Sequence, residues 1–217
     1  MVVESDSSVD KVNKTLAALR NNKFNAIYVI DREQALQKVL ELLASRAVIG
    51  AADSLTLKQI GVFRESERRG FKLFWPFDER VPKSERRDVA RKALLTDVFL
   101  TSSNALTMDG KIVNVDASGN RVAGMIFGPK KAIIVVGVNK IVENVEKALE
   151  RIRNVAAPLN AKRIWEERGW ELLPCVKAGR CVDCDAENRI CNVTTIIEKK
   201  PRAIDITVVI VGEKLGL

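Results

Sequence analysis

Short apolar runs alternate with amphipathic segments through the first half of this chain, and this alternation most limits how it can fold. The runs are short enough to be buried strands, and they occupy residues 26–30, 47–51, 71–74 and 98–101. Between them, apolar residues recur at helical spacing, which predicts helices at residues 8–20, 31–43, 55–69 and 85–95. The alternation predicts an α/β fold, with a mostly parallel sheet and helices on both faces.

The pattern changes after residue 101. Asp109-Gly110 predicts a hairpin turn, and the next residues alternate as a strand would. The most apolar runs, residues 132–137 and 204–211, are predicted as buried strands of the same sheet. Further helices are expected at residues 121–127, at 139–154 and, after a turn, within 158–170. We expect one domain over residues 1–217.

All four cysteines lie in one segment, residues 174–192, which we call the cysteine segment. Their spacing is C-x5-C-x2-C-x6-C, and a C-x2-C pair supplies two metal ligands on one tight turn. The chain has no histidine, so a four-thiolate site is expected, with zinc or an iron–sulfur cluster left open. The alternative is reduced thiols or a redox-active disulfide. The cysteines are Cys175, Cys181, Cys184 and Cys191.

The ends and the apolar runs of the chain predict a cytoplasmic protein. No run approaches the ~20 apolar residues that a bilayer span needs. The first residues carry neither the basic nor the apolar region of a secretory signal. Thiols stay reduced in the cytosol, which favours metal binding over a disulfide framework there.

Charge and residue types narrow the functional classes. The net charge is +8, but acids alternate with the bases and aromatic residues are only 5%, so we expect no specific nucleic-acid binding. A diffuse positive field favours small anionic ligands instead. Without histidine, Ser-His-Asp and Cys-His catalysis are excluded, and proton transfer must use Asp, Glu, Lys, Cys or Tyr28.

Polar residues follow several of the predicted strands and predict a ligand-binding rim. Parallel sheets bind ligands beyond the carboxyl ends of their strands. A guanidinium in this group could hold a carboxylate through two hydrogen bonds. The alternative is helix capping and turn formation by the same residues. The candidates are Asp53, Ser54, Thr56, Ser102, Ser103, Asn104, Asp116, Gly119, Asn120, Arg121, Gly137 and Asn139.

Several stretches resemble the lactate-utilisation (LUD) domain family. Residues 98–142 resemble its central signature, and residues 47–61, residues 151–163 and the terminal VGEKLGL resemble it too. The chain is most similar to the small stand-alone members that carry the cysteine segment. One departure is the Ala51-Ala52-Asp53-Ser54 stretch, which stands where a glycine-rich turn is expected and is less suited to cradling phosphate.

The resemblance implies a fold like that of ribose-phosphate isomerases, glucosamine-phosphate deaminases and CoA transferases. It also implies a role in lactate or organic-acid utilisation, in some relatives as a subunit of a lactate-oxidising complex with iron–sulfur partner subunits. Accordingly, we expect a small anionic carboxylate or phosphate ligand and a cysteine-bound metal or cluster. No motif for a nucleotide cofactor is evident, and a homo-oligomer is compatible with the sequence.

Two alternatives stay open at this point. One is an autonomous enzyme of the sugar-phosphate isomerase or CoA-transferase type, in which Glu213 or Asp116 is the catalytic carboxylate. Glu213 follows the last predicted strand, where CoA transferases of this fold carry a nucleophilic glutamate. The other is a non-catalytic assembly or regulatory module whose zinc is structural.

Overall fold

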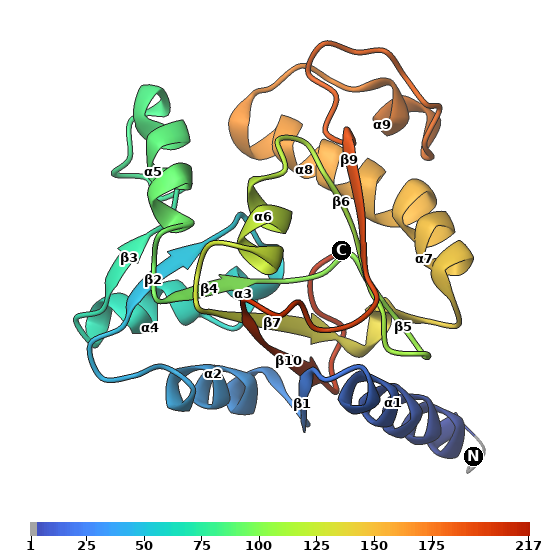
Figure 1. Cartoon of the computed structure of the whole chain (residues 1–217). Coiled ribbons are helices and arrows are strands. Elements are labelled where there is room, and N and C mark those ends of the chain that lie inside the picture. Colours follow the sequence, from blue (N-terminus) through green and yellow to red (C-terminus); the bar gives the residue numbers. More distant parts are fainter. Residues whose placement is uncertain (1–3) are drawn as a thin grey trace.

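A mostly parallel sheet forms the centre of the molecule and confirms the α/β fold. The structure is a computed structural model that describes residues 4–217 (Figure 1). In these residues the main sheet has the strand order β1-β10-β7-β4-β2-β3, and all its pairs are parallel. Its strands are β1 (Asn25–Val29), β2 (Val48–Ala51), β3 (Lys72–Phe74), β4 (Val98–Thr101), β7 (Lys131–Gly137) and β10 (Asp205–Val211).

A second, smaller sheet packs beside the first, where the sequence predicted only one. Its order is β8-β5-β6-β9; β6 pairs antiparallel with β5 and β9, and β5 pairs parallel with β8. Two of its strands have only two or three residues, too few to show a periodic pattern. The strands are β5 (Ala105–Thr107), β6 (Ile112–Asp116), β8 (Ile141–Val142) and β9 (Val193–Ile197).

Three helices begin at a polar side chain that caps them. The side chains of Asp31, Ser54 and Asn144 accept hydrogen bonds from backbone N–H groups in the first turns of α2, α3 and α7. The helices are α1 (Glu4–Asn21), α2 (Arg32–Glu41), α3 (Leu55–Gln59), α4 (Val62–Arg68), α5 (Arg86–Ala93), α6 (Asn120–Ile126), α7 (Val145–Arg151), α8 (Ala157–Arg168) and α9 (Pro174–Ala178).

Three helix predictions are wrong in detail. The helix predicted at residues 55–69 is broken by Gly61, whose φ of 74° lies in the left-handed region. The helix predicted from Asn139 begins only at Val145, after a 3₁₀ turn and β8, and Asn144 caps it. It then continues through a π-helical turn, Ile152–Ala156, directly into α8, where a turn and a short helix were predicted.

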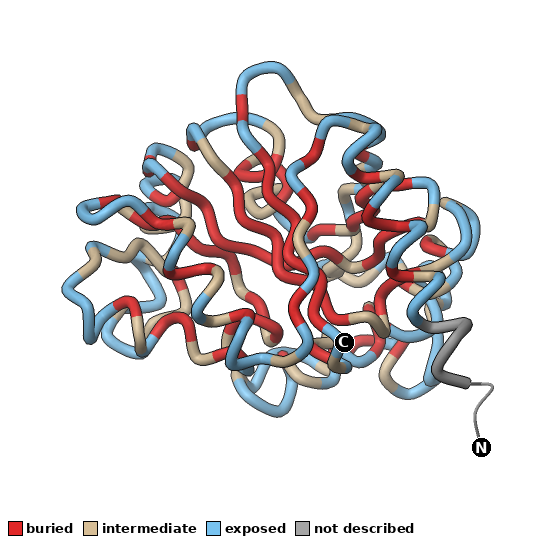
Figure 2. Tube along the Cα trace, turned by 90° about the horizontal axis from the view of Figure 1, so that it is seen from below, coloured by how far each residue is buried: buried red, intermediate tan, exposed pale blue. Residues whose placement is uncertain are grey.

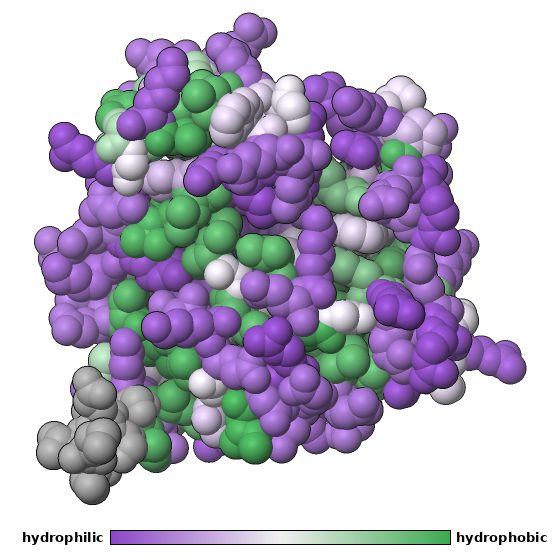
Figure 3. All heavy atoms as spheres, turned by 180° about the vertical axis from the view of Figure 1, so that it is seen from behind, coloured by the Kyte–Doolittle hydropathy of each residue, from purple (hydrophilic) through white to green (hydrophobic). Residues whose placement is uncertain are grey.

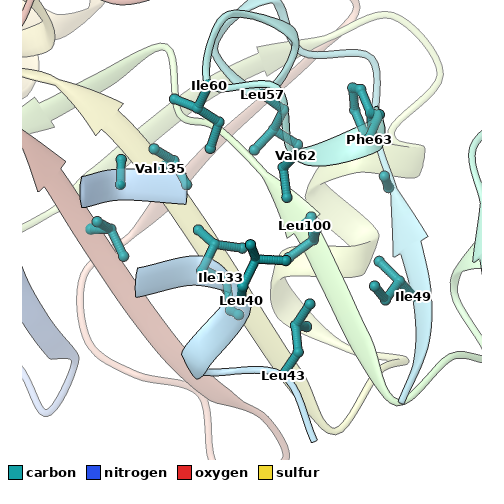
Figure 4. Close-up of a cluster of buried hydrophobic side chains, with 14 of the residues drawn as sticks. Leu40, Leu43, Ile49, Leu57, Ile60, Val62, Phe63, Leu100, Ile133 and Val135 are labelled. Atoms are coloured by element: carbon teal, nitrogen blue, oxygen red, sulfur yellow. The ribbon is translucent and has the colours of Figure 1, made fainter. Parts of the chain in front are cut away.

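Both faces of the main sheet are buried, which explains its continuous apolar runs. On one face, Leu40 and Leu57 from α2 and α3 pack against Ile133 and Val135 (Figure 4). On the other face, α1 and α6 cover the alternate side chains of the same strands, such as Ile134. Buried positions therefore concentrate along the central strands, and exposed ones lie in the outer loops (Figure 2).

The face of the molecule seen from behind is mainly hydrophilic (Figure 3). Seen from behind, polar side chains cover most of the molecule, with apolar atoms visible between them (Figure 3). Among the helices of the described residues, none has the length and apolar character needed to cross a bilayer.

Candidate functional site

A cavity of about 200 Å³ lies at the carboxyl ends of β2 and β4. Its wall combines the turns after these two strands, the β6–α6 turn, one face of α8 and residues 216–217. Parallel strands end at the same edge of a sheet, so chain segments far apart in sequence meet there. The cavity is thus built at the place where the predicted rim was expected.

Nine of the twelve rim candidates line this cavity. Their ligand-binding role stays a prediction, but the structure brings them together as expected from the strand ends. They are Asp53, Ser54, Thr56, Ser102, Ser103, Asn104, Asp116, Asn120 and Arg121.

The other three candidates lie outside the cavity lining. Gly119 has a φ of 78° and precedes α6. A side chain on Gly137 would place its Cβ 2.5 Å from the backbone nitrogen of Leu215, so glycine allows the C-terminal segment to pass closely. The Asn139 amide oxygen accepts a hydrogen bond from that same nitrogen at 3.1 Å. Gly137 and Asn139 therefore position the C-terminal segment.

Lys140 is the central cavity residue that the sequence prediction missed. It follows the predicted strand at residues 132–137 and is only 5% exposed. Its Nζ lies 3.1 Å from Thr56 Oγ1, 3.2 Å from Ser102 Oγ and 3.3 Å from the Ser103 carbonyl oxygen. A lone lysine between Val138 and Ile141 was the one available signal, because a charge in an apolar stretch is unusual.

The environment of Lys140 disfavours its protonated form. Burial, followed by the positive charges of Arg151 and Arg121, lowers the pKa of Lys140 to about 7. Arg151 is fixed in place because it donates hydrogen bonds to the carbonyl oxygens of Asn139, Asn104 and Leu217. In the part of the chain that the structure describes, Lys140 forms no ion pair.

Arg121 and Asp116 form a buried ion pair in the cavity wall. The Arg121 Nε donates to Asp116 Oδ1 at 2.8 Å, and both side chains are nearly inaccessible. Arg121 also bonds Asn104 and Asn114 and the carbonyl oxygens of Ser102 and Val115. Its guanidinium joins the end of β4 to β6 and has its donors occupied. This pair builds the wall of the cavity, and its arginine leaves little donor capacity for a ligand.

Asp53 is held by two arginines of α8. Arg163 donates to Asp53 Oδ2 at 2.6 Å, and Arg168 contacts the same oxygen. Burial works against ionisation, but the two guanidinium groups outweigh it and hold the pKa of Asp53 below its usual range. The other oxygen, Oδ1, is buried and accepts no hydrogen bond from any described residue. This leaves one buried acceptor oxygen without a hydrogen-bond partner among the described residues.

The charges around the cavity favour an anion. Four cations line it, namely Arg121, Lys140, Arg163 and Arg168, against two carboxylates, Asp53 and Asp116. Both carboxylates are already paired with arginines. Lys140 therefore remains the buried cation without a counter-charge.

Glu213 lies apart from these groups. Its carboxylate pairs with Arg32 at 2.8 Å, and its side chain is 30% exposed. It is not among the residues that line the cavity. The structure thus places Asp116, but not Glu213, in the cavity wall.

The cysteine segment sits beside the cavity and contributes Ile190 to its lining. Cys175 is buried in α9, and the other cysteines are partly exposed free thiols. The backbone N–H of Asp183 donates to Cys181 Sγ at 3.4 Å. Arg189 donates to the carbonyl oxygens of Cys184 and Cys191.

The thiols also influence one another. Burial raises the pKa of Cys175, and the neighbouring Cys184, Cys191 and Cys181 raise it further. In residues 4–217, however, no three Cys, Asp or Glu side chains are arranged closely enough to bind one ion.

Comparisons with known proteins identify the family of this chain and support its fold. A family model described as the LUD domain matches residues 12–211. A solved structure, described as a DUF162 family protein from Deinococcus radiodurans, is similar with a TM-score of 0.55 and 14% identity. The similarity covers 94% of this chain and 98% of that one, and at this identity it supports the fold alone. No curated protein matches the chain.

Proposed function

Since this chain belongs to the LUD domain family, we propose that its cavity binds a small organic acid of the lactate type, a 2-hydroxy or 2-oxo carboxylate. The observation that carries this proposal is the burial of Lys140 without a counter-charge. A buried ammonium group is costly unless an anion accompanies it. A ligand carboxylate would supply that anion.

Size and polar groups support the same class of ligand. The cavity volume of about 200 Å³ is below the range typical of drug-sized ligands, and it suits an acid of a few carbon atoms. The hydroxyl groups of Thr56 and Ser102 adjoin Lys140 and can donate to a carboxylate. A hydroxyl group on the ligand could donate to the unpaired Oδ1 of Asp53.

Acid binding should be linked to protonation of Lys140. The bound anion favours the charged amine, whereas the free cavity lowers its pKa to about 7. Affinity should therefore be highest below pH 7 and should fall as the pH rises above it.

Calorimetric titration with L-lactate, pyruvate and inorganic phosphate tests the proposal. Lys140→Met should weaken binding of the acids by about 30-fold or more, the cost of removing one partner from a buried charge pair. The control is Lys131→Met, because Lys131 is half-buried, bonds the Leu42 carbonyl oxygen and does not line the cavity. Unchanged acid binding by Lys140→Met would refute the proposal.

We also propose that the cysteine segment binds zinc or an iron–sulfur cluster through its four cysteines. The supporting observations are the N–H bond to Cys181 Sγ, which stabilises a thiolate, and the mutual influence of the thiols. A metal cation would offset the repulsion among four thiolates. Zinc would stabilise the fold of the segment, whereas a cluster would also carry electrons to a partner protein.

Anaerobic purification followed by metal and sulfide analysis tests this second proposal. Broad absorption near ~400 nm with iron and sulfide indicates a cluster, and a colourless protein with one zinc per chain indicates a structural site. Cys184→Ser should lower the bound metal in either case. Protein that purifies and reconstitutes without any metal would refute the site.

A further inference from the structure

We propose that Lys140 is a nucleophile, and that its amine condenses with the carbonyl group of a 2-oxo acid to form an imine inside the cavity. This inference rests on the proposed function, because the same cavity must admit the acid. It adds a covalent step that acid binding alone does not require. The ligand class is thereby narrowed to a carboxylate with an adjacent ketone or aldehyde, for which pyruvate is the probe.

The first support is the space and the partners around the amine. Nζ is surrounded by the two hydroxyl groups of Thr56 and Ser102 and by one carbonyl oxygen. Gly216 passes beside it with a φ of 67°, and a Cβ there would lie 2.6 Å from Nζ. Glycine at this position therefore leaves room next to the amine.

The second support is electrostatic. A lysine with a purely structural role in a buried wall is normally paired with a carboxylate. Lys140 instead faces Arg121 from α6 and Arg151 from α7, and both carboxylates of the cavity are bound to other arginines. Burial and these two cations lower its pKa to about 7, so a large fraction is a neutral amine near neutral pH. Desolvation and a neighbouring cation are the two ways in which lysine nucleophiles are activated.

The chemistry balances with the groups present. The lone pair of Nζ forms a bond to the carbonyl carbon, and the carbonyl oxygen takes up a proton. That proton and a second one both come from the amine nitrogen, and the oxygen leaves with them as water while the C=N bond forms. The hydroxyl groups of Thr56 and Ser102 lie within hydrogen-bonding distance of Nζ and can relay these protons. These two hydroxyl groups can also donate hydrogen bonds to the ligand carboxylate when Nζ is neutral and no longer pairs with it.

Reductive trapping tests the inference. The whole protein is incubated with pyruvate and sodium cyanoborohydride, and intact mass and peptide mapping follow. The expected product carries the mass of pyruvic acid less one oxygen atom, at Lys140. Labelling there should exceed that of exposed lysines by up to about 10³-fold, the ratio of their neutral fractions at pH 7. L-Lactate, which has no ketone or aldehyde group, should give no adduct.

Two variants separate chemistry from folding. Lys140→Arg keeps the charge but cannot form the imine, so it should lose the adduct. Lys131→Arg should keep it. The trapping rate should rise with pH through about 7, as Lys140 loses its proton. Circular dichroism and thermal unfolding confirm that each variant is folded.

The outcomes distinguish the two proposals. If calorimetry shows that pyruvate binds but no adduct forms at Lys140, the imine is refuted and acid binding stands. Equal labelling in Lys140→Arg and in the unmodified protein also refutes the imine. If no acid binds and no adduct forms, both proposals fail. An adduct confined to Lys140 supports the imine.

Discussion

The cavity and the cysteine segment lie side by side but are held in different ways. In the cavity wall, Arg121 alone bonds five residues on two stretches of chain, residues 102–104 and 114–116, and Asp53 is tied to arginines more than 100 residues away. In the cysteine segment, Arg189 bonds mainly its own neighbours. Its links outward include Cys181 to the Arg153 carbonyl and Asn192 to the Asp116 carbonyl.

The difference indicates two kinds of site. The polar groups of the cavity are held in place by hydrogen bonds to the core, a preorganisation that the proposed acid binding would use. The cysteine segment has little apolar packing of its own, with Cys175, Leu173 and Ile190 among a few such residues. A segment of this kind gains most from a ligand that joins its parts, as a metal ion does.

The largest effect should come from breaking the buried ion pair of the cavity wall. Arg121→Met leaves Asp116 buried and unpaired, and it should lower the free energy of unfolding by about 3–5 kcal/mol. Urea unfolding measures this loss. The control is Arg91→Met, whose partner Asp88 is exposed, and it should change stability by less than about 1 kcal/mol. Equal losses of unfolding free energy in Arg121→Met and Arg91→Met would contradict the expected difference between the buried and the exposed ion pair.

The next effect is the pH dependence of stability due to Lys140. Its pKa in the folded state is about 7, below its ordinary value of 10.5, so the unfolded chain binds more protons between these values. Stability should therefore rise from pH 7 towards 10.5, by at most about 1.4 kcal/mol per pH unit, and the burial penalty should be fully present below pH 7. Lys140→Met should remove this slope and should be more stable than the unmodified protein at pH 6. If the stability of Lys140→Met still rises with pH over this range, groups other than Lys140 cause the pH dependence.

A smaller, local effect should follow from a change in the cysteine segment. Arg189→Ala removes donors to the carbonyl oxygens of Cys184 and Cys191. Hydrogen exchange in residues 180–192 should accelerate by about tenfold, while the global free energy of unfolding falls by about 1 kcal/mol or less. Acid binding in the cavity should be retained. A global loss comparable to that of Arg121→Met would show that the two regions are equally integrated.

The smallest effect is expected at Glu213. Its ion pair with Arg32 is partly exposed, so Glu213→Gln should change stability by about 0.5 kcal/mol and leave acid affinity unchanged. Calorimetry with pyruvate measures the affinity. If the variant loses binding or a measurable activity, Glu213 belongs to the site and the CoA-transferase type of chemistry regains support.

The main sheet was predictable because both of its faces are buried. Strands such as β7 and β10 are continuous apolar runs, and local periodicity suffices to identify them. The second sheet was missed because β5 and β8 are too short for a pattern, and β9 has Thr194 and Thr195 at its centre. Their strand character depends on pairing with β6, which is a tertiary interaction.

The position of the cavity was predictable, but its key residue was not. Strand ends identify Asp53, Ser102 and Asp116 because parallel strands finish at one edge. The burial of Lys140 depends on contacts with Thr56, Ser102 and Gly216, which are distant in sequence, and sequence periodicity does not report it. The pairing of Asp53 with Arg163 and Arg168 joins residues 110 and 115 positions apart, which also lies beyond local patterns.

The π-helical turn at Ile152–Ala156 makes α7 and α8 a single rod with one extra residue in its middle. Arg151 lies before this turn, the Arg153 carbonyl within it, and Arg163 and Arg168 after it. Each residue turns a helix by about 100°, so losing the extra one would swing α8 around its axis by that angle. The two arginines would then turn away from Asp53. The spacing between α7 and α8 is therefore needed, together with the arginine side chains, to hold Asp53 in its ion pairs.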